Sequence, residues 1–200
     1  MNISIQSDLD KAVQKLQSAC APEQFRFAVA KALTATARDV QAEVKGNMPS
    51  RFTLRRQWIV NGIRIQPANK YNLESVVFSR DKFMGLQEFG GPKDPRGNYL
   101  AVPTSMVRRT PKQLIKKADR PNQLGDKATV VDFQGRKYLA LKKPRKGANG
   151  QMLRFLYLLI PRAQIDERLG LREDGQRVAR QRFGPNLLDA IEYAMRTARR

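Results

Sequence analysis

The spacing of apolar residues changes twice along this chain, from a helical period to a strand-like period and back. From Phe25 to Val44, apolar residues recur at every third or fourth position, which predicts a long helix that begins at Pro22 and ends near Gly46. A similar stripe near the carboxyl end predicts an amphipathic C-terminal helix, with Pro185 at its start. Its apolar residues are Leu187, Leu188, Ile191, Ala194, Met195 and Ala198. This order, helices followed by strands and then a helix, predicts an α+β fold.

The segment between the long helices indicates a mainly antiparallel sheet with long basic loops. After an expected helical turn within residues 52–60, apolar stretches bounded by turn residues predict strands at 63–66, 73–79, 99–102, 128–133 and 137–141. Gln134 and Gly135 are expected to form the turn between the last two. The stretch Met152–Ile160 is apolar at consecutive positions, so we expect it to be the central strand, ended by Pro161. The sequence Gly90-Gly91-Pro92 predicts the end of a secondary-structure element, followed by a loop.

The amino-terminal residues predict a short amphipathic helix from Asp8 to Cys20, capped by Ser7. Cys20 is the only cysteine, so no intrachain disulfide can form, and its simplest role is that of a small apolar residue. The first residues lack the basic and apolar regions of a signal peptide. The longest apolar run, Phe155–Ile160, is too short to span a bilayer. We therefore expect a soluble protein of a reducing cytoplasm without membrane contact.

Length and hydrophobic content are compatible with one domain over residues 1–200. Within it, residues 104–150 are expected to form an excursion rich in basic loops, with 104–127 and 142–150 ordered only by neighbours. The C-terminal stripe is expected to pack against the sheet, beside Phe155 and Tyr157 or the residues on the opposite face.

Positive charge is concentrated away from the amino terminus. The chain has 38 Lys and Arg against 18 Asp and Glu, and residues 51–200 hold 32 of the former and 13 of the latter. Such an excess destabilises a fold by self-repulsion, which suggests a negatively charged partner. Two segments, 108–120 and 136–146, hold six basic residues each. Candidate contacts to a polyanion or an acidic protein are Arg108, Arg109, Lys112, Lys116, Lys117, Arg136, Lys137, Lys142, Lys143, Arg145 and Lys146.

These segments have two interpretations of similar weight, solvated loops or contacts to phosphates or carboxylates. Only one aromatic residue, Tyr138, lies in either segment, so the sequence does not support base stacking as a way of binding single strands.

The residue types present restrict the possible chemistry. Histidine is absent, which excludes Ser-His and Cys-His nucleophiles and zinc sites that contain histidine. Asp39, Glu43 and Lys45 have a spacing similar to that of some metal-dependent nucleases, but they lie on a helix of apolar period, which favours a solvated helix face. Pro92 disqualifies the glycine pair before it as a phosphate-binding loop. We therefore expect no enzyme, no catalytic residue, no metal and no cofactor.

The order of these patterns resembles a bacteriophage family. The long helix reads FAVAKALTATARDVQAEV and is followed by MPSRFTLRRQWIVNGIRI, VVFS and LQEFGG; the carboxyl end reads FLYLLIP and NLLDAIEYAMRTARR. Over residues 20–105 and 150–200 this is similar to the neck and tail-completion proteins of long-tailed phages, broadly the group of the minor tail protein Z. That family has no active site, so none is implied here.

The resemblance implies an α+β virion protein that forms a ring, expected to contain six copies, at the head-proximal end of the tail. Its implied neighbours are tail-terminator, tail-tube or head-completion proteins, and it would be assembled in the host cytoplasm. Lys and Arg would line a lumen that faces DNA or the tape-measure protein. The main rival is a free, non-sequence-specific nucleic-acid-binding protein, and a processing nuclease is a weaker one.

Overall fold

The computed structural model describes residues 22–144 and 151–198, so the helix expected at 8–20 lies outside the described residues. Its contacts divide the chain into two compact units, where the sequence analysis expected one domain. We call them the helical unit, residues 22–88 with 168–198, and the sheet unit, residues 89–144 with 151–167. The helical unit combines both ends of the described chain, and the sheet unit is inserted between them. The fold is α+β, as predicted, and every strand pairing is antiparallel.

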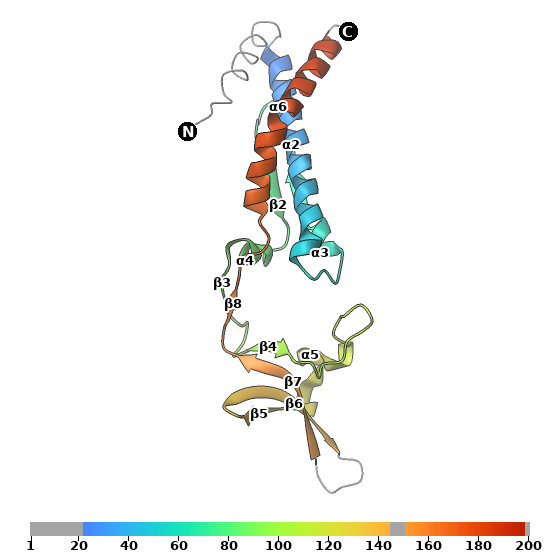
Figure 1. The fold of residues 1–200 in the computed structure, drawn as a ribbon, viewed down its shortest axis with the longest axis vertical. Helices are drawn as coiled ribbons and strands as arrows, with labels where there is room; N and C mark the ends of the chain where they lie inside the picture. Colours follow the sequence, from blue (N-terminus) through green and yellow to red (C-terminus); the bar gives the residue numbers. More distant parts are fainter. Residues whose placement is uncertain (1–21, 145–150, 199–200) are drawn as a thin grey trace. The chain divides into compact units, whose positions relative to one another are not determined.

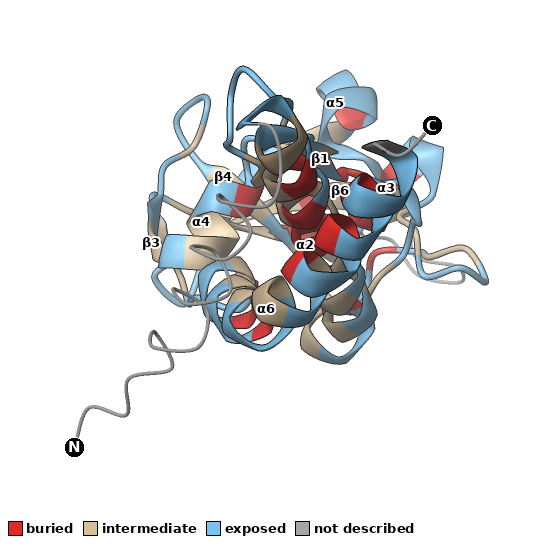
Figure 2. Cartoon of the chain, turned by 90° about the horizontal axis from the view of Figure 1, so that it is seen from above, coloured by how far each residue is buried: buried red, intermediate tan, exposed pale blue. Residues whose placement is uncertain are grey.

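Two long helices, α2 (Pro22–Arg51) and α6 (Leu171–Ala198), run antiparallel and form most of the helical unit (Figure 1). Small residues on α2 allow α6 to approach closely, because Ala28 and Ala32 are buried against Leu187 and Ile191. Figure 2 shows the buried positions along α2 in red.

The packing predicted for the C-terminal stripe was wrong. Leu187 and Ile191 pack against α2 instead of the sheet, and Leu188 and Met195 are exposed. Pro185 also does not begin the helix: α6 starts at Leu171, and the proline lies inside it. The sequence analysis did not predict the first turns of α6. Only Asp174 and Val178 are buried in these turns, so they lack an apolar stripe.

The remaining elements of the helical unit cover the other end of α2. They are α3 (Trp58–Asn61), β1 (Ile63–Gln66), β2 (Val76–Ser79) and α4 (Met84–Phe89). The bounds of β1 are as predicted, whereas β2 is shorter than the expected 73–79. Ile63 joins Val44 and Met48 in a buried core, and the side-chain amide of Gln41 donates to the carbonyl of Ile63 at 2.7 Å. This core fixes the hairpin on α2.

The sheet unit contains a two-stranded sheet and a four-stranded sheet. In the first, β3 (Gly91–Lys93) pairs with β8 (Ala163–Ile165). The Gly-Gly-Pro pattern was expected to mark a stop followed by a loop, but Gly91 and Pro92 form part of β3. In the second, the order is β4 (Leu100–Pro103), β7 (Gln151–Ile160), β6 (Arg136–Pro144) and β5 (Ala128–Phe133). The predicted strand at 152–160 is therefore central. Gln134 and Gly135 form the predicted turn, both with positive φ, as a tight hairpin requires.

A β-bulge shapes the core of the sheet unit. Leu139 pairs with Tyr157 and Ala140 with Phe155, so Leu156 is an extra residue on β7. Leu156 and Tyr157 are consequently both buried although they are adjacent in the chain.

The segment between β4 and β5 packs against this core. Val107 and Leu124 belong to the same buried cluster as Leu156 and Tyr157. The segment also contains the short helices η1 (Lys117–Asp119), α5 (Pro121–Leu124) and η2 (Gly125–Lys127). Residues 104–127 are therefore a packed cover of the sheet, which corrects the expectation of a loose arm.

Candidate polyanion-binding surface

A buried carboxylate organises the first basic segment. Asp119 is 1% exposed and accepts hydrogen bonds from the backbone N–H of Arg108 at 2.9 Å and from its Nη2 at 2.6 Å. Arg154 lies 3.7 Å from the same carboxylate, and the Tyr157 hydroxyl donates to the Asp119 carbonyl at 2.6 Å. The hydrogen bonds from Arg108 outweigh burial and lower the pKa of Asp119 to about 2.

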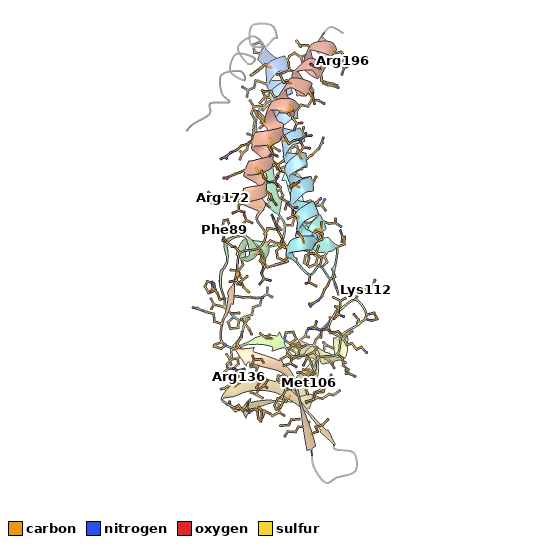
Figure 3. The ribbon with its side chains drawn as sticks, viewed as in Figure 1. Phe89, Met106, Lys112, Arg136, Arg172 and Arg196 are labelled. Carbon is orange, nitrogen blue, oxygen red and sulfur yellow. The ribbon has the colours of Figure 1, made fainter. Side chains whose placement is uncertain are left out.

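These contacts divide the predicted cations into two groups. Arg108 is bound to Asp119, so its charge is matched within the fold. Arg109 donates to the carbonyl of Gln113 at 3.2 Å, which closes the loop that ends in a bridge to Ile115. Lys112, Lys116 and Lys117 are exposed and form no ion pair with the described residues; Figure 3 labels Lys112 on this loop. The three lysines are thus the part of the segment with unmatched charge.

The second basic segment lies on β6. Arg136 and Lys142 are exposed and point to the same face of the sheet, because they are separated by an even number of residues. Lys137 points to the other face, where its Nζ donates to the Tyr99 hydroxyl at 3.2 Å, and this hydrogen bond raises the pKa of Lys137. The side chain of Lys143 and the whole of Arg145 and Lys146 lie outside the described residues.

The sheet unit has a strong positive balance overall. Residues 89–167 contain 17 Lys and Arg against six Asp and Glu. Of those six carboxylates, Asp119 faces Arg108 and Asp94 faces Arg162 at 2.7 Å, so they do not neutralise the lysines of the basic segments. An anion that approaches this unit meets a net positive surface.

The carboxylates that resembled a nuclease site join the two helices instead. Asp39 on α2 accepts from the side-chain amide of Asn186 at 2.9 Å, and Glu43 accepts from Arg177 at 2.6 Å. The hydrogen bonds from Arg177 and then Asn47 lower the pKa of Glu43. These side chains are therefore occupied as interhelical partners.

A buried carboxylate on α6 completes this network. Asp174 accepts from Arg51 at 2.7 Å and from Asn47 at 2.9 Å. Burial favours the neutral acid, but the hydrogen bonds from Arg51, Asn47 and Arg177 outweigh it and lower the pKa of Asp174. The network fixes the register of α2 against α6 and leaves no free catalytic carboxylate within it.

Other features of the described chain offer little for catalysis. An apolar groove of about 530 Å³ lies between α2, β2 and α6, and Arg180 is its only charged lining residue. Within residues 22–144 and 151–198, no group of three potential metal ligands occurs. No helix in that part of the chain is long and apolar enough to cross a membrane.

Folding also gathers aromatic residues that the sequence analysis had treated as separate. Phe133, Tyr138 and Phe155 come from three adjacent strands and meet on one face of the sheet. Only Tyr138 lies in a basic segment, which is why a search within those segments missed the cluster. The alternation of Arg136, Tyr138, Ala140 and Lys142 along β6 was the signal available in the sequence.

Comparison with known proteins adds no family to this description. No protein-family model matches the chain, and no curated protein or solved structure matches it.

Proposed function

We propose that this chain is a structural virion protein of the neck or tail end of a long-tailed phage. In this role it forms a ring that completes the tail and supports head-tail joining around the DNA channel. The proposal rests on the sequence resemblance together with one structural observation, that both units expose surfaces suited to neighbouring subunits. It implies a virion location and no enzymatic activity.

The exposed surfaces of the helical unit include large aromatic side chains. Trp58 and Phe83 form an edge-to-face pair with ring centroids 6.1 Å apart, and each is almost half exposed. Tyr71 is 81% exposed. Single exposed apolar residues are ordinary, but an exposed aromatic pair is typical of a protein interface.

The four-stranded sheet has two open edges. Within the described residues, β4 and β5 each pair on one side only. Because four strands alternate in direction, β5 runs opposite to β4, so copies placed side by side in one orientation can continue the sheet with antiparallel pairing. Such head-to-tail contacts generate rings when the rotation between copies closes. The basic surface of the sheet unit would then face DNA or the tape-measure protein.

The mass of the particle that the purified full chain forms in solution tests the proposal. Native mass spectrometry and light scattering should show a closed oligomer, six copies by our expectation, without nucleic acid. Phe83→Ser should shift this oligomer toward the monomer and leave the folding of the monomer intact. Leu188→Ser, an exposed position on α6, is the matched control and should leave the oligomer unchanged. A wild-type chain that stays monomeric at tens of micromolar would refute the ring.

The second candidate is a non-sequence-specific nucleic-acid-binding protein. The unmatched charges of Lys112, Lys116 and Lys117 favour it, because contacts to phosphate give affinity without reading sequence. A monomer that changes mass only when duplex DNA is added would support this candidate over the ring. In vitro complementation of tails that lack this protein, mixed with filled heads, then provides a functional readout.

A further inference from the structure

The two faces of the four-stranded sheet differ in how they are covered. Leu139, Leu141 and Tyr157 point to the face that packs against Val107 and Leu124. The opposite face carries Phe133 of β5, Tyr138 of β6 and Phe155 of β7, and none of these belongs to a buried cluster of the described residues. The sheet unit therefore presents one open aromatic face, which we call the aromatic face.

The rings on this face form a connected group. The centroid of Phe155 lies 5.0 Å from that of Tyr138 and 5.4 Å from that of Phe133, at interplanar angles of 57° and 33°. Phe133 is 48% exposed, and Tyr138 and Phe155 are partly exposed. Ala140 lies on the same face two residues further along β6, but it is 0% exposed, so its neighbours cover it. A planar group can therefore reach Phe133 and the exposed parts of Tyr138 and Phe155.

Cations stand at both ends of this group. Arg136 lies opposite Phe133 in the strand register, and Lys142 lies six residues further along β6 on the same face. At about 3.4 Å per residue the two positions are about 20 Å apart. The other residues of β5 to β7 on this face include Thr129, Val131, Leu153 and Leu158, and no carboxylate is among the described ones. Asp132 points to the opposite face, with Lys137.

We propose that the aromatic face binds single-stranded nucleic acid. Unpaired bases stack on Phe133 and Tyr138, while Arg136 and Lys142 contact the phosphates on either side. Open four-stranded sheets with exposed rings are a general platform for two or three bases, and every base has a π-face, so the binding is not specific for sequence. A duplex cannot use the rings, because its bases are already stacked on each other.

The chemistry of the face favours a nucleic acid over an acidic protein. Both ligands would satisfy the cations, but Tyr138 and Phe155 lie between the two cations and Phe133 lies level with Arg136, so a ligand that reaches both cations must also pass over aromatic rings. Unpaired bases attached to a phosphate backbone can use both kinds of contact, whereas an acidic side chain uses only the cations. This site is distinct from the unmatched lysines at residues 112–117, which offer phosphate contacts alone. The inference is also independent of the ring proposal. The mass of the oligomer formed by the chain tests the ring, whereas base-dependent binding tests the aromatic face.

The test compares ligands that differ only in their bases. Fluorescence anisotropy measures binding of the full chain to a labelled oligothymidylate of about 20 nucleotides and to an abasic backbone of the same length, at about 0.15 M salt. We expect the oligothymidylate to bind at least five-fold more tightly than the abasic strand, and more tightly than a duplex of the same length. Equal affinities for oligothymidylate and abasic strand would overturn the proposal.

Substitutions then locate the site. Phe133→Leu and Tyr138→Leu should each weaken oligothymidylate binding at least five-fold without changing abasic binding. Tyr138→Phe retains the ring and should retain binding, which separates stacking from a general loss of structure. Arg136→Gln with Lys142→Gln should weaken both ligands, whereas Lys93→Gln with Arg96→Gln removes the same charge elsewhere in the unit and should have a smaller effect.

Two further outcomes would contradict the proposal. If polyglutamate displaces the oligothymidylate as well as an unlabelled copy of that oligonucleotide does at equal charge, the face recognises acidic protein rather than bases. If the Leu variants bind like the wild type while the control pair loses as much affinity as the Arg136 and Lys142 pair, binding is a property of the general charge of the unit.

Discussion

Replacing Asp119 by asparagine should destabilise the sheet unit without affecting the helical unit. The asparagine keeps the shape of the side chain and one acceptor for the backbone N–H of Arg108, but it removes the charge. Arg108 then loses its ion pair, and Arg154, whose side chain is 15% exposed, loses its nearest carboxylate. The variant thus isolates the electrostatic part of this contact.

The pKa of Asp119 determines the expected magnitude. It falls from the ordinary 3.8 to about 2 on folding. A depressed pKa means that the ionised carboxylate stabilises the fold above pH 4, by about 2 kcal/mol. This contribution is lost as the pH falls through the folded pKa, so about half of it remains at pH 3. Asp119→Asn should therefore cost about 2 kcal/mol at pH 7 and about half as much at pH 3.

Amide hydrogen exchange with peptide resolution can measure this loss in one unit. Exchange in residues 136–142 and 152–160 should accelerate about thirty-fold at pH 7, while the unfolding transition reported by Trp58 fluorescence in the helical unit stays unchanged. Asp94→Asn is the control, because Asp94 and Arg162 form an exposed pair on the same unit and should contribute less than about 0.5 kcal/mol. An equal effect of both substitutions, or a loss independent of pH, would refute the argument.

Four further tests concern the packing of the helical unit and the unmatched lysines. Ile191→Asp places a carboxylate in the buried contact with α2 and should cost at least about 3 kcal/mol, whereas Leu188→Asp, at an exposed position, should leave the urea midpoint nearly unchanged. Gly62→Ala should lower the free energy of unfolding by about 1–3 kcal/mol, because its Cβ would lie 2.4 Å from the Asp81 carboxylate. Gly46→Ala, with open space around the new Cβ, should instead stabilise α2 by up to about 1 kcal/mol. Trp58 fluorescence during urea unfolding measures both changes. Glu88→Gln weakens the carboxylate that accepts from the N–H groups of Leu171 and Arg172, so exchange at the start of α6 should accelerate by about five-fold, and unchanged exchange would show that this cap contributes nothing. Neutralising Lys112, Lys116 and Lys117 together should preserve the melting temperature and reduce the salt dependence of duplex binding, and a salt dependence equal to that of the wild type would mean that these lysines do not contact phosphate.

Local sequence patterns predicted the elements that have regularly spaced apolar residues or characteristic turn residues. The strand at Ala128–Phe133, its turn at Gln134 and Gly135, and the central position of β7 follow from alternation, turn chemistry and apolar character. The start of α6 did not follow, because its cap comes from Glu88, more than eighty residues earlier in the chain. A helix whose first turns are polar and whose cap is supplied by tertiary contact has no local signature.

At the candidate site, too, the sequence indicated individual residues but not their contacts in the fold. The sequence analysis named the cations as candidates but could not separate Arg108, which is bound to Asp119, from the lysines with unmatched charge. It also could not bring Phe133, Tyr138 and Phe155 together, because the bulge at Leu156 sets which residues of β7 face which side. Register between strands depends on pairings that a single strand does not encode.

The insertion of the sheet unit between α2 and α6 has a consequence for biosynthesis. During translation α2 leaves the ribosome long before Leu187 and Ile191, the residues that cover Ala28 and Ala32, and at 5–20 residues per second the delay is about 10 to 30 seconds. The sheet unit is contiguous in sequence, so its hairpins can form within that interval. An apolar helix surface is thus left unpaired on every nascent chain, and we expect the yield of folded protein to depend on chaperones that shield α2 until α6 is complete.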